Sequence, residues 1–185
     1  RTSQVPVNKT ALVLGGGVAG MNVALSLAEQ GFPVHLVERT DQLGGHLRNV
    51  HFLIGADGAG YSGKKPPVVE ATLDPQVYLR ELIEKVTRHP LVTVHLQTEL
   101  AGTGGFVGNF GSKLQAATGN TITVNHGVTI VATGGREYRG KEYGYGTSPR
   151  IVTGQEFEAM LAPSTAALAA APASNFRPLT SDLRL

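Results

Sequence analysis

Residues 11–38 restrict the possible folds more than any other part of the chain. Residues 11–14, Ala-Leu-Val-Leu, form a short apolar run that ends at glycines, which is the pattern of a buried parallel strand. Apolar side chains then recur at helical spacing over residues 18–30 and stop at Gly31, and residues 33–38 predict a second strand. A strand, a glycine turn, a helix and a strand within 28 residues predict a βαβ unit.

The remaining elements extend this unit into an α/β domain. Asp74 and Pro75 are a good N-cap and first residue for a helix over residues 75–88. The other expected elements are a strand at 91–96, a hairpin or meander of short strands around 105–117 and 120–125, a buried strand at 127–133 and a helix at 153–162. We therefore expect a Rossmann-like, doubly wound parallel sheet with a small antiparallel β-meander inserted before its last strand.

The turn of the βαβ unit carries a G-x-G-x-x-G motif at residues 15–20. In such a turn Gly15 permits the sharp bend, Gly17 lets the backbone approach a pyrophosphate, and Gly20 lets the helix pack closely on the strand. The following helix N-terminus offers free N–H groups to an anion. The groups expected on the pyrophosphate are the backbone N–H groups of Val18, Ala19 and Gly20.

Glu38 ends the second strand, 18 residues beyond Gly20, where a carboxylate would bind the adenosine ribose diol. A carboxylate at this position also repels a 2′-phosphate and so disfavours NADP. The next side chain, Arg39, either lies over the adenine or is solvated.

Composition excludes several other functions. The chain has 24 glycines among 185 residues but no cysteine, so these residues hold no disulfide, thiolate nucleophile or cysteine-bound cluster. A net charge of +2 without a basic patch does not indicate nucleic-acid binding. No histidine pattern indicates a metal site, and no G-x-S-x-G elbow indicates a hydrolase. With no membrane span or secretory signal in view, we expect a cytoplasmic location.

Two further motifs resemble the FAD-binding domain of glutathione-reductase-like flavoproteins. These are Leu43-Gly44-Gly45 and residues 129–135, Thr-Ile-Val-Ala-Thr-Gly-Gly. In that family the glycine pair passes close to the flavin pyrophosphate and ribitol, and the Ala-Thr-Gly strand end lies beside the cofactor. The resemblance therefore implies FAD, held in addition by the backbone at Leu43, Gly44, Gly45, Leu100, Ala132, Thr133 and Gly134.

The order of motifs after residue 100 resembles the FAD domain in the A subunit of heterodisulfide reductase. The motifs are Gly-Phe-Val-Gly-Asn-Phe at 105–110, the Ala-Thr-Gly strand end, Glu-Tyr-Gly-Tyr-Gly at 142–146 and Val-Thr-Gly-Gln-Glu-Phe-Glu at 152–158. The match covers roughly residues 10–162. It implies a flavin-dependent, electron-transferring oxidoreductase that works with iron–sulfur subunits of a reductase complex. Because the flavin ring carries such chemistry, we name no catalytic residue.

The chain also departs from that family. The cluster-binding cysteine motifs are absent, residues 55–67 look like an insertion, and no Gly-Asp pair follows to complete the flavin site. We therefore expect an incomplete FAD domain at 1–162, followed at 163–185 by an Ala/Pro-rich linker or the start of a second dinucleotide domain that would bind NAD(P)H. Such a fragment is expected to bind FAD weakly, to be inactive alone and to tend to self-associate.

Two other functions stay open on the residues alone. One is a fragment of an NAD-binding dehydrogenase, and the other is a non-catalytic Rossmann-fold interaction module.

Overall fold

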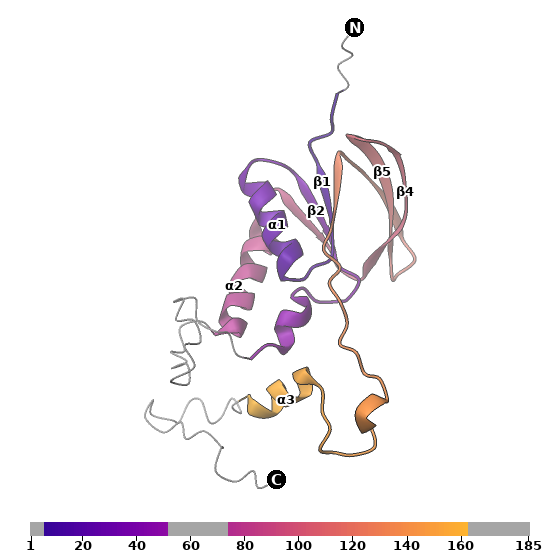
Figure 1. Cartoon of the computed structure of the whole chain (residues 1–185). Coiled ribbons are helices and arrows are strands. Elements are labelled where there is room, and N and C mark those ends of the chain that lie inside the picture. The colour runs from indigo at the N-terminus through magenta and orange to yellow at the C-terminus, as the bar shows by residue number, and fades with distance from the viewer. Residues whose placement is uncertain (1–5, 52–73, 163–185) are drawn as a thin grey trace.

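A parallel four-stranded sheet forms the centre of the fold in the computed structural model, which describes residues 6–51 and 74–162 (Figure 1). Its strands are β1 (Ala11–Leu14), β2 (Val34–Val37), β3 (Val92–His95) and β7 (Val128–Val131), in the order β3-β2-β1-β7. Strands β2 and β3 lie to one side of β1 and β7 lies to the other. The switch point of the sheet is therefore between β1 and β7, where such folds bind ligands.

Two helices cover one face of this sheet and form the main apolar core. Helix α1 (Val18–Glu29) and helix α2 (Pro75–Arg88) pack on alternate side chains of the strands, because successive strand residues point to opposite faces. Helix α2 begins as expected, since the Asp74 side chain accepts hydrogen bonds from the N–H groups of Gln76 and Val77. The core they enclose includes Val13, Met21, Ala24, Leu36, Leu79, Leu82 and Val86.

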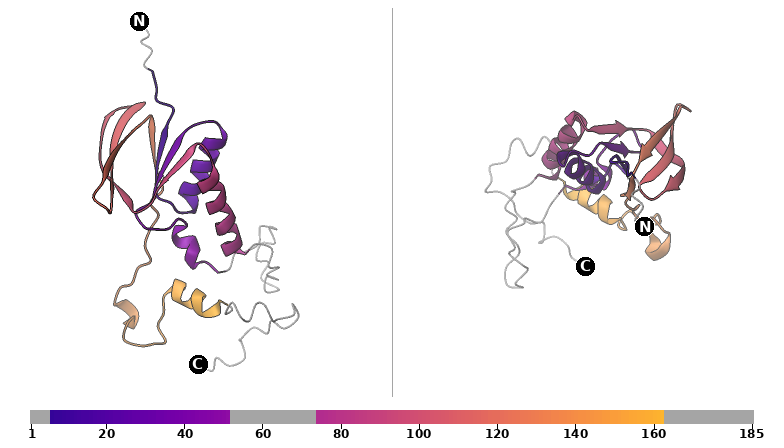
Figure 2. Two further views of the ribbon diagram at one scale, coloured as in Figure 1. Left: turned by 180° about the vertical axis from the view of Figure 1, so that it is seen from behind. Right: turned by 90° about the horizontal axis from the view of Figure 1, so that it is seen from above.

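An antiparallel meander covers the other face of the sheet (Figure 2). It consists of β4 (Thr98–Phe106), β5 (Asn109–Ala116) and β6 (Thr121–His126). A second, smaller core joins the two sheets through Leu12 and Val37 on one side and Leu114 and Val124 on the other.

The first strand of the meander is longer than the sequence predicts. We expected pairing to begin near residue 105, because the Gly-Thr-Gly-Gly run at 102–105 is typical of a loop. In the structure Gln97 adopts a positive φ of 49° and turns the chain directly into β4. The glycines then pair across to β5, after a bulge between Leu100 and Gly102. Long-range pairing has thus overridden the weak local preference for strand.

The last segment of the described chain lies beyond the carboxyl ends of the parallel strands (Figure 1). After β7 the chain runs through a short 3-10 turn, η2 (Glu142–Gly144), to helix α3 (Gly154–Leu161). Thr153 and Glu156 form a capping box at the start of α3. Helix α3 lies against a second 3-10 turn, η1 (Gly45–Asn49), in a region that we expected to be loop.

The predicted fold class is confirmed, and the helix bounds agree with the sequence to within a residue or two. The predicted insertion at 55–67 and the predicted tail at 163–185 lie outside the described residues. The division into domains stays a prediction.

Candidate functional site

The glycine loop forms a sharp turn between β1 and α1. Gly15 has φ of 110°, and a side chain on it would overlap the carbonyl group of Ala132. A side chain on Gly20 would overlap the carbonyl oxygen of Gly15, so only glycine lets α1 pack this closely. At Gly17 the direction of a side chain is open, with no atom within 4 Å. Of these three glycines, Gly17 therefore turns its bare backbone toward free space.

The N-terminus of α1 is arranged to bind an anion. Gly17 occupies the N-cap without a side-chain hydrogen bond, and the first turn contains no acidic residue. The N–H groups of Val18, Ala19 and Gly20 belong to this first turn, which has no intrahelical acceptors to offer them. Together with the helix dipole they favour a phosphate at this end.

Glu38 is tied directly to the glycine loop. Its Oε2 accepts a hydrogen bond from the Gly16 N–H at 2.8 Å, and its Oε1 accepts from the Thr40 N–H at 2.8 Å and the Thr40 hydroxyl at 2.9 Å. Burial alone would raise the pKa of Glu38, but these donors and the positive charge of Arg39 lower it below the usual value of a glutamate. The side chain is therefore an ionised acceptor beside the loop.

The glycine pair lies against the same loop. The Gly44 N–H donates to the Gly16 carbonyl at 2.8 Å, and Gly44 forms a parallel bridge with Gly17. Both glycines have positive φ, 120° at Gly44 and 53° at Gly45. The preceding Leu43 is buried and anchors this turn in the main core. Motifs 27 residues apart in sequence thus form one backbone surface.

The end of β7 borders this surface from the other side. The Ala132 N–H donates to the Leu14 carbonyl at 2.8 Å, which continues the strand pairing past β7 and brings Ala132 against Gly15. Thr133 and Gly134 follow, and Gly134 has a positive φ of 65°. The predicted site residues from three distant segments therefore meet at the switch point of the sheet.

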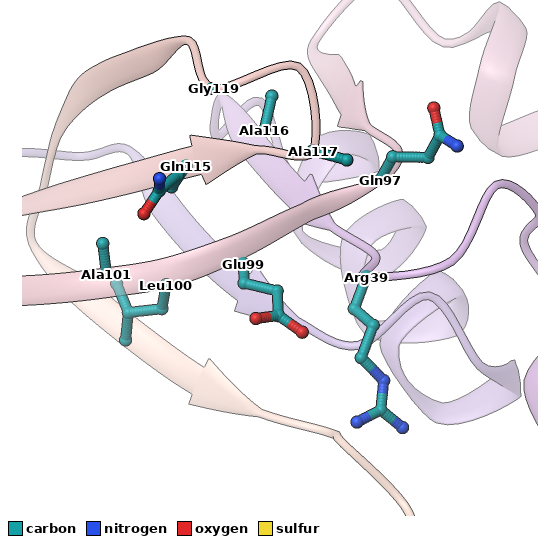
Figure 3. Close-up of a pocket in the computed structure, with 9 residues that line it drawn as sticks. All are labelled: Arg39, Gln97, Glu99, Leu100, Ala101, Gln115, Ala116, Ala117 and Gly119. Carbon is teal, nitrogen blue, oxygen red and sulfur yellow. The ribbon is translucent and has the colours of Figure 1, made fainter.

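Arg39 and Leu100 belong to a neighbouring pocket rather than to the loop itself (Figure 3). This open pocket of about 360 Å³ lies where the end of β2 meets the meander. Its remaining lining residues are Gln97, Glu99, Ala101, Gln115, Ala116, Ala117 and Gly119. The pocket therefore combines a cation, polar side chains and small residues next to Glu38.

The sequence reasoning did not find most of these lining residues. They come together because β4 and β5 pair Thr98 with Ala116, and because the Ala117 N–H donates to the Gln97 carbonyl at 2.8 Å. A register between distant strands leaves no local signal in one sequence. The reasoning also missed His46, whose ring hydrogen-bonds to Gly135 and Gln155.

The chain resembles known proteins at this site and in its fold. Residues 13–85 match the family model of an NAD(P)-binding Rossmann-like domain, which includes the glycine loop, Glu38 and the glycine pair. The A subunit of the CoB–CoM heterodisulfide reductase of Methanopyrus kandleri is 30% identical over 109 residues, or 59% of this chain. The corresponding subunit of Methanocaldococcus jannaschii is 31% identical over 106 residues, or 57% of this chain. The chain is homologous to the A subunit of heterodisulfide reductase.

This homology covers only a part of the heterodisulfide reductase subunits. The chain spans 14% of the length of both of these relatives. Within that part, the family match and the homology place a dinucleotide-binding domain at the amino-terminal end of this chain.

Solved structures share the fold. L-proline dehydrogenase from P. horikoshii superposes with a TM-score of 0.54 at 22% identity, over 72% of this chain and 23% of that one. A bacillithiol disulfide reductase from Bacillus cereus superposes with a TM-score of 0.50 at 18% identity, over 73% of this chain and 44% of that one. No helix within the described ranges is long and apolar enough to cross a membrane.

Proposed function

We propose that this chain is the FAD-binding domain of an electron-transferring oxidoreductase similar to the A subunit of heterodisulfide reductase. The observation that carries the proposal is the single backbone surface made by the glycine loop, the glycine pair and the end of β7. The Gly44–Gly16 hydrogen bond and the Gly44–Gly17 bridge join two of these segments, and the contact of Gly15 with Ala132 joins the third. In this role the protein binds and orients the flavin, and the flavin transfers the electrons.

The adenosine end of FAD would bind at Glu38 and in the neighbouring pocket. An ionised carboxylate has about four lone-pair positions, and three are used by the donors on Gly16 and Thr40. The Thr40 hydroxyl has one hydrogen but two acceptors in reach, Glu38 Oε1 and the Gln42 carbonyl, both at 2.9 Å. Turning this hydroxyl to Gln42 frees a second lone pair, so both hydroxyls of a ribose diol can donate to Glu38.

The adenine would enter the pocket beside Arg39 and Leu100. Its volume of about 360 Å³ lies within the usual range of small-molecule sites. A guanidinium group can stack on a purine ring, and Glu99 and Gln97 supply polar partners for its edge. The pyrophosphate would then lie on the N-terminus of α1, opposite the open side of Gly17.

The glycine pair favours FAD over NAD. A dinucleotide that ends at the loop of α1 has no need of a second glycine turn, whereas a flavin continues past the pyrophosphate into its ribitol. The backbone of Gly45, Thr133 and Gly134 lies where this continuation would run. By the homology, the partners would be iron–sulfur subunits of a reductase complex, with NAD(P)H as a further reductant.

Fluorescence titration of the purified chain with FAD tests the proposal, because protein contact changes flavin emission. We expect saturable FAD binding, competition by ADP and no competition by NADP. A chain that binds NAD but not FAD would instead be a dehydrogenase fragment. A chain that binds neither would be an interaction module.

A further inference from the structure

His46 joins three segments that are far apart in the sequence. Its Nε2 hydrogen-bonds to the Gly135 carbonyl oxygen, 89 residues away, and its Nδ1 to the side-chain amide of Gln155, 109 residues away, at 2.8 Å. Because a carbonyl oxygen only accepts, Nε2 carries the proton and Nδ1 accepts from the amide N–H of Gln155. One rigid ring thus holds both the segment after β7 and helix α3 against η1.

Helix α3 depends on such polar contacts for its position. It has only eight residues, too few for a stable isolated helix. None of its described side chains belongs to either apolar core, and Phe157 and Met160 are 55% and 70% exposed. Apolar burial therefore contributes little to fixing α3 on the domain.

Three further hydrogen bonds fasten α3, and each comes from outside the helix. The Glu137 carboxylate accepts from the Gln155 N–H at 2.9 Å, and Glu158 accepts from the His51 N–H at 2.7 Å. The Tyr145 hydroxyl donates to Glu156 at 2.8 Å. Among the four contacts, His46 is the one that also reaches the strand end, because its second nitrogen bonds Gly135.

His46 follows directly on the glycine pair. Gly45 precedes it in the chain, and Gly44 is bonded to the glycine loop. On the other side of the ring, Gly135 follows Gly134, whose φ of 65° turns the strand end. A force on the imidazole is therefore transmitted to both backbone segments that border the ring end of the proposed flavin site.

We propose that His46 is a positioning residue that fastens α3 and the segment after β7 onto the glycine pair and so closes the ring end of the dinucleotide site. It acts through the backbone at Gly45 and Gly134 and need not touch the flavin itself. The proposal rests on the proposed function for its effect on FAD, but its effect on α3 does not depend on any cofactor.

Two side chains can replace one half of the ring each. In His46→Gln the amide reaches the position of Nε2 and can still donate to Gly135. In His46→Asn the shorter amide reaches the position of Nδ1 and can still accept from Gln155. His46→Ala removes both bonds, and His51→Ala is the matched control, since His51 binds Glu158 through its backbone N–H.

The first measurement is amide hydrogen exchange of residues 154–161 in the full chain without cofactor. We expect faster exchange in His46→Ala, partial protection in His46→Asn and wild-type protection in His51→Ala. Gln155→Ala should also speed exchange, and adding it to His46→Ala should change little more, because both remove the same bond. Unchanged exchange in His46→Ala would overturn the proposal whatever the cofactor.

The second measurement is the FAD titration of the same variants. We expect His46→Ala to weaken FAD binding about tenfold and His46→Gln about threefold, as for one or two neutral hydrogen bonds. The visible circular dichroism of bound flavin should change in His46→Ala and be restored partly in His46→Gln, since it reports how the ring end is held.

The two proposals fail in different ways. A wild-type chain that binds no FAD contradicts the proposed function, while the exchange data still decide whether His46 fastens α3. A wild-type chain that binds FAD beside a His46→Ala variant with equal affinity overturns the positioning role alone. If His46→Ala fails to fold, Gln155→Ala gives the same two measurements from the α3 side.

Discussion

Glu38 is the side chain on which nucleotide specificity depends. It binds both the loop N–H of Gly16 and the backbone of Thr40, so its carboxylate is fixed before any ligand arrives. Such pre-organisation lowers the entropy that binding must overcome.

Replacing Glu38 should weaken FAD binding without unfolding the domain. We expect Glu38→Ala to cost about 1–3 kcal/mol of binding free energy, as for hydrogen bonds to a charged acceptor. Fluorescence titration measures the change, and Glu29→Ala, at the far end of α1, serves as the control. An FAD affinity equal to wild type in Glu38→Ala would show that the ribose lies elsewhere.

Gly17 and Gly20 separate binding from folding. The side-chain direction of Gly17 is open, so Gly17→Val should fold but place a branched side chain where the pyrophosphate is proposed to lie. Far-UV circular dichroism should match wild type while FAD binding is lost. Gly20→Val should instead destabilise the domain itself, because its side chain would overlap the Gly15 carbonyl. Retained FAD in Gly17→Val would mean that the loop does not hold the pyrophosphate.

At the scale of elements, the contact between the two sheets contains three histidines. His35 on β2 and His95 on β3 stack with ring centroids 5.2 Å apart and share a hydrogen bond of 2.9 Å between Nδ1 and Nε2. His126 on β6 is fully buried, where Nδ1 bonds the Val128 carbonyl at 3.0 Å and Nε2 bonds the Ser112 hydroxyl at 2.8 Å. No metal-binding group of three or more His, Cys, Asp or Glu side chains occurs among the described residues.

These three histidines should make the stability of the domain sensitive to acid. Burial lowers the pKa of all three, and the neighbouring His95 and His126 lower the pKa of His35 further. Below about pH 6.5 the unfolded chain therefore binds more protons than the folded one, so stability falls as the pH drops through the lowered pKa values. Urea unfolding should show a lower midpoint near pH 5 than near pH 7.5.

A double substitution distinguishes the histidines from the carboxylates that also titrate in acid. His35→Phe with His95→Phe keeps the stacked arrangement but removes two of the three titrating groups. The urea midpoint of this variant should depend less on pH in that range, whereas His51→Phe should behave like wild type. Equal pH dependence in the wild type and the double variant would contradict the argument.

The sequence predicted those elements whose signals are local. The βαβ unit, the Asp74–Pro75 helix start and the Thr153 helix start all depend on residues within one or two turns. The predicted glycine motifs do meet at one edge, because parallel strands bring their carboxyl ends together. By contrast, the histidine contact, the Arg39 pocket and the His46 bonds depend on strand register and on contacts 60 to 109 residues apart. No local pattern encodes those contacts.

At the scale of the whole molecule, ligand binding should appear as thermal stability. At FAD concentrations about 100 times Kd, binding to the folded state alone adds about 2.7 kcal/mol. For a chain of this size we expect the unfolding temperature to rise by roughly 5–10 °C. Differential scanning fluorimetry measures the shift, and AMP, which offers only the adenosine end and one phosphate, should give a smaller one. A melting curve that FAD leaves in place would contradict binding to the folded chain.

Strand β7 has one consequence for the molecule as a particle in solution. It pairs with β1 on one side and is the last strand in the order β3-β2-β1-β7, with Val128 and Val131 46% and 70% exposed. Within the described ranges its outer backbone groups therefore form a template onto which a strand from another chain can add. Growth from such a template depends on concentration and is blocked by a charge, so Val131→Lys should shift the sedimentation of a concentrated sample toward the monomer. An accessible strand edge would then limit how densely this protein can be kept in solution, independently of what it binds.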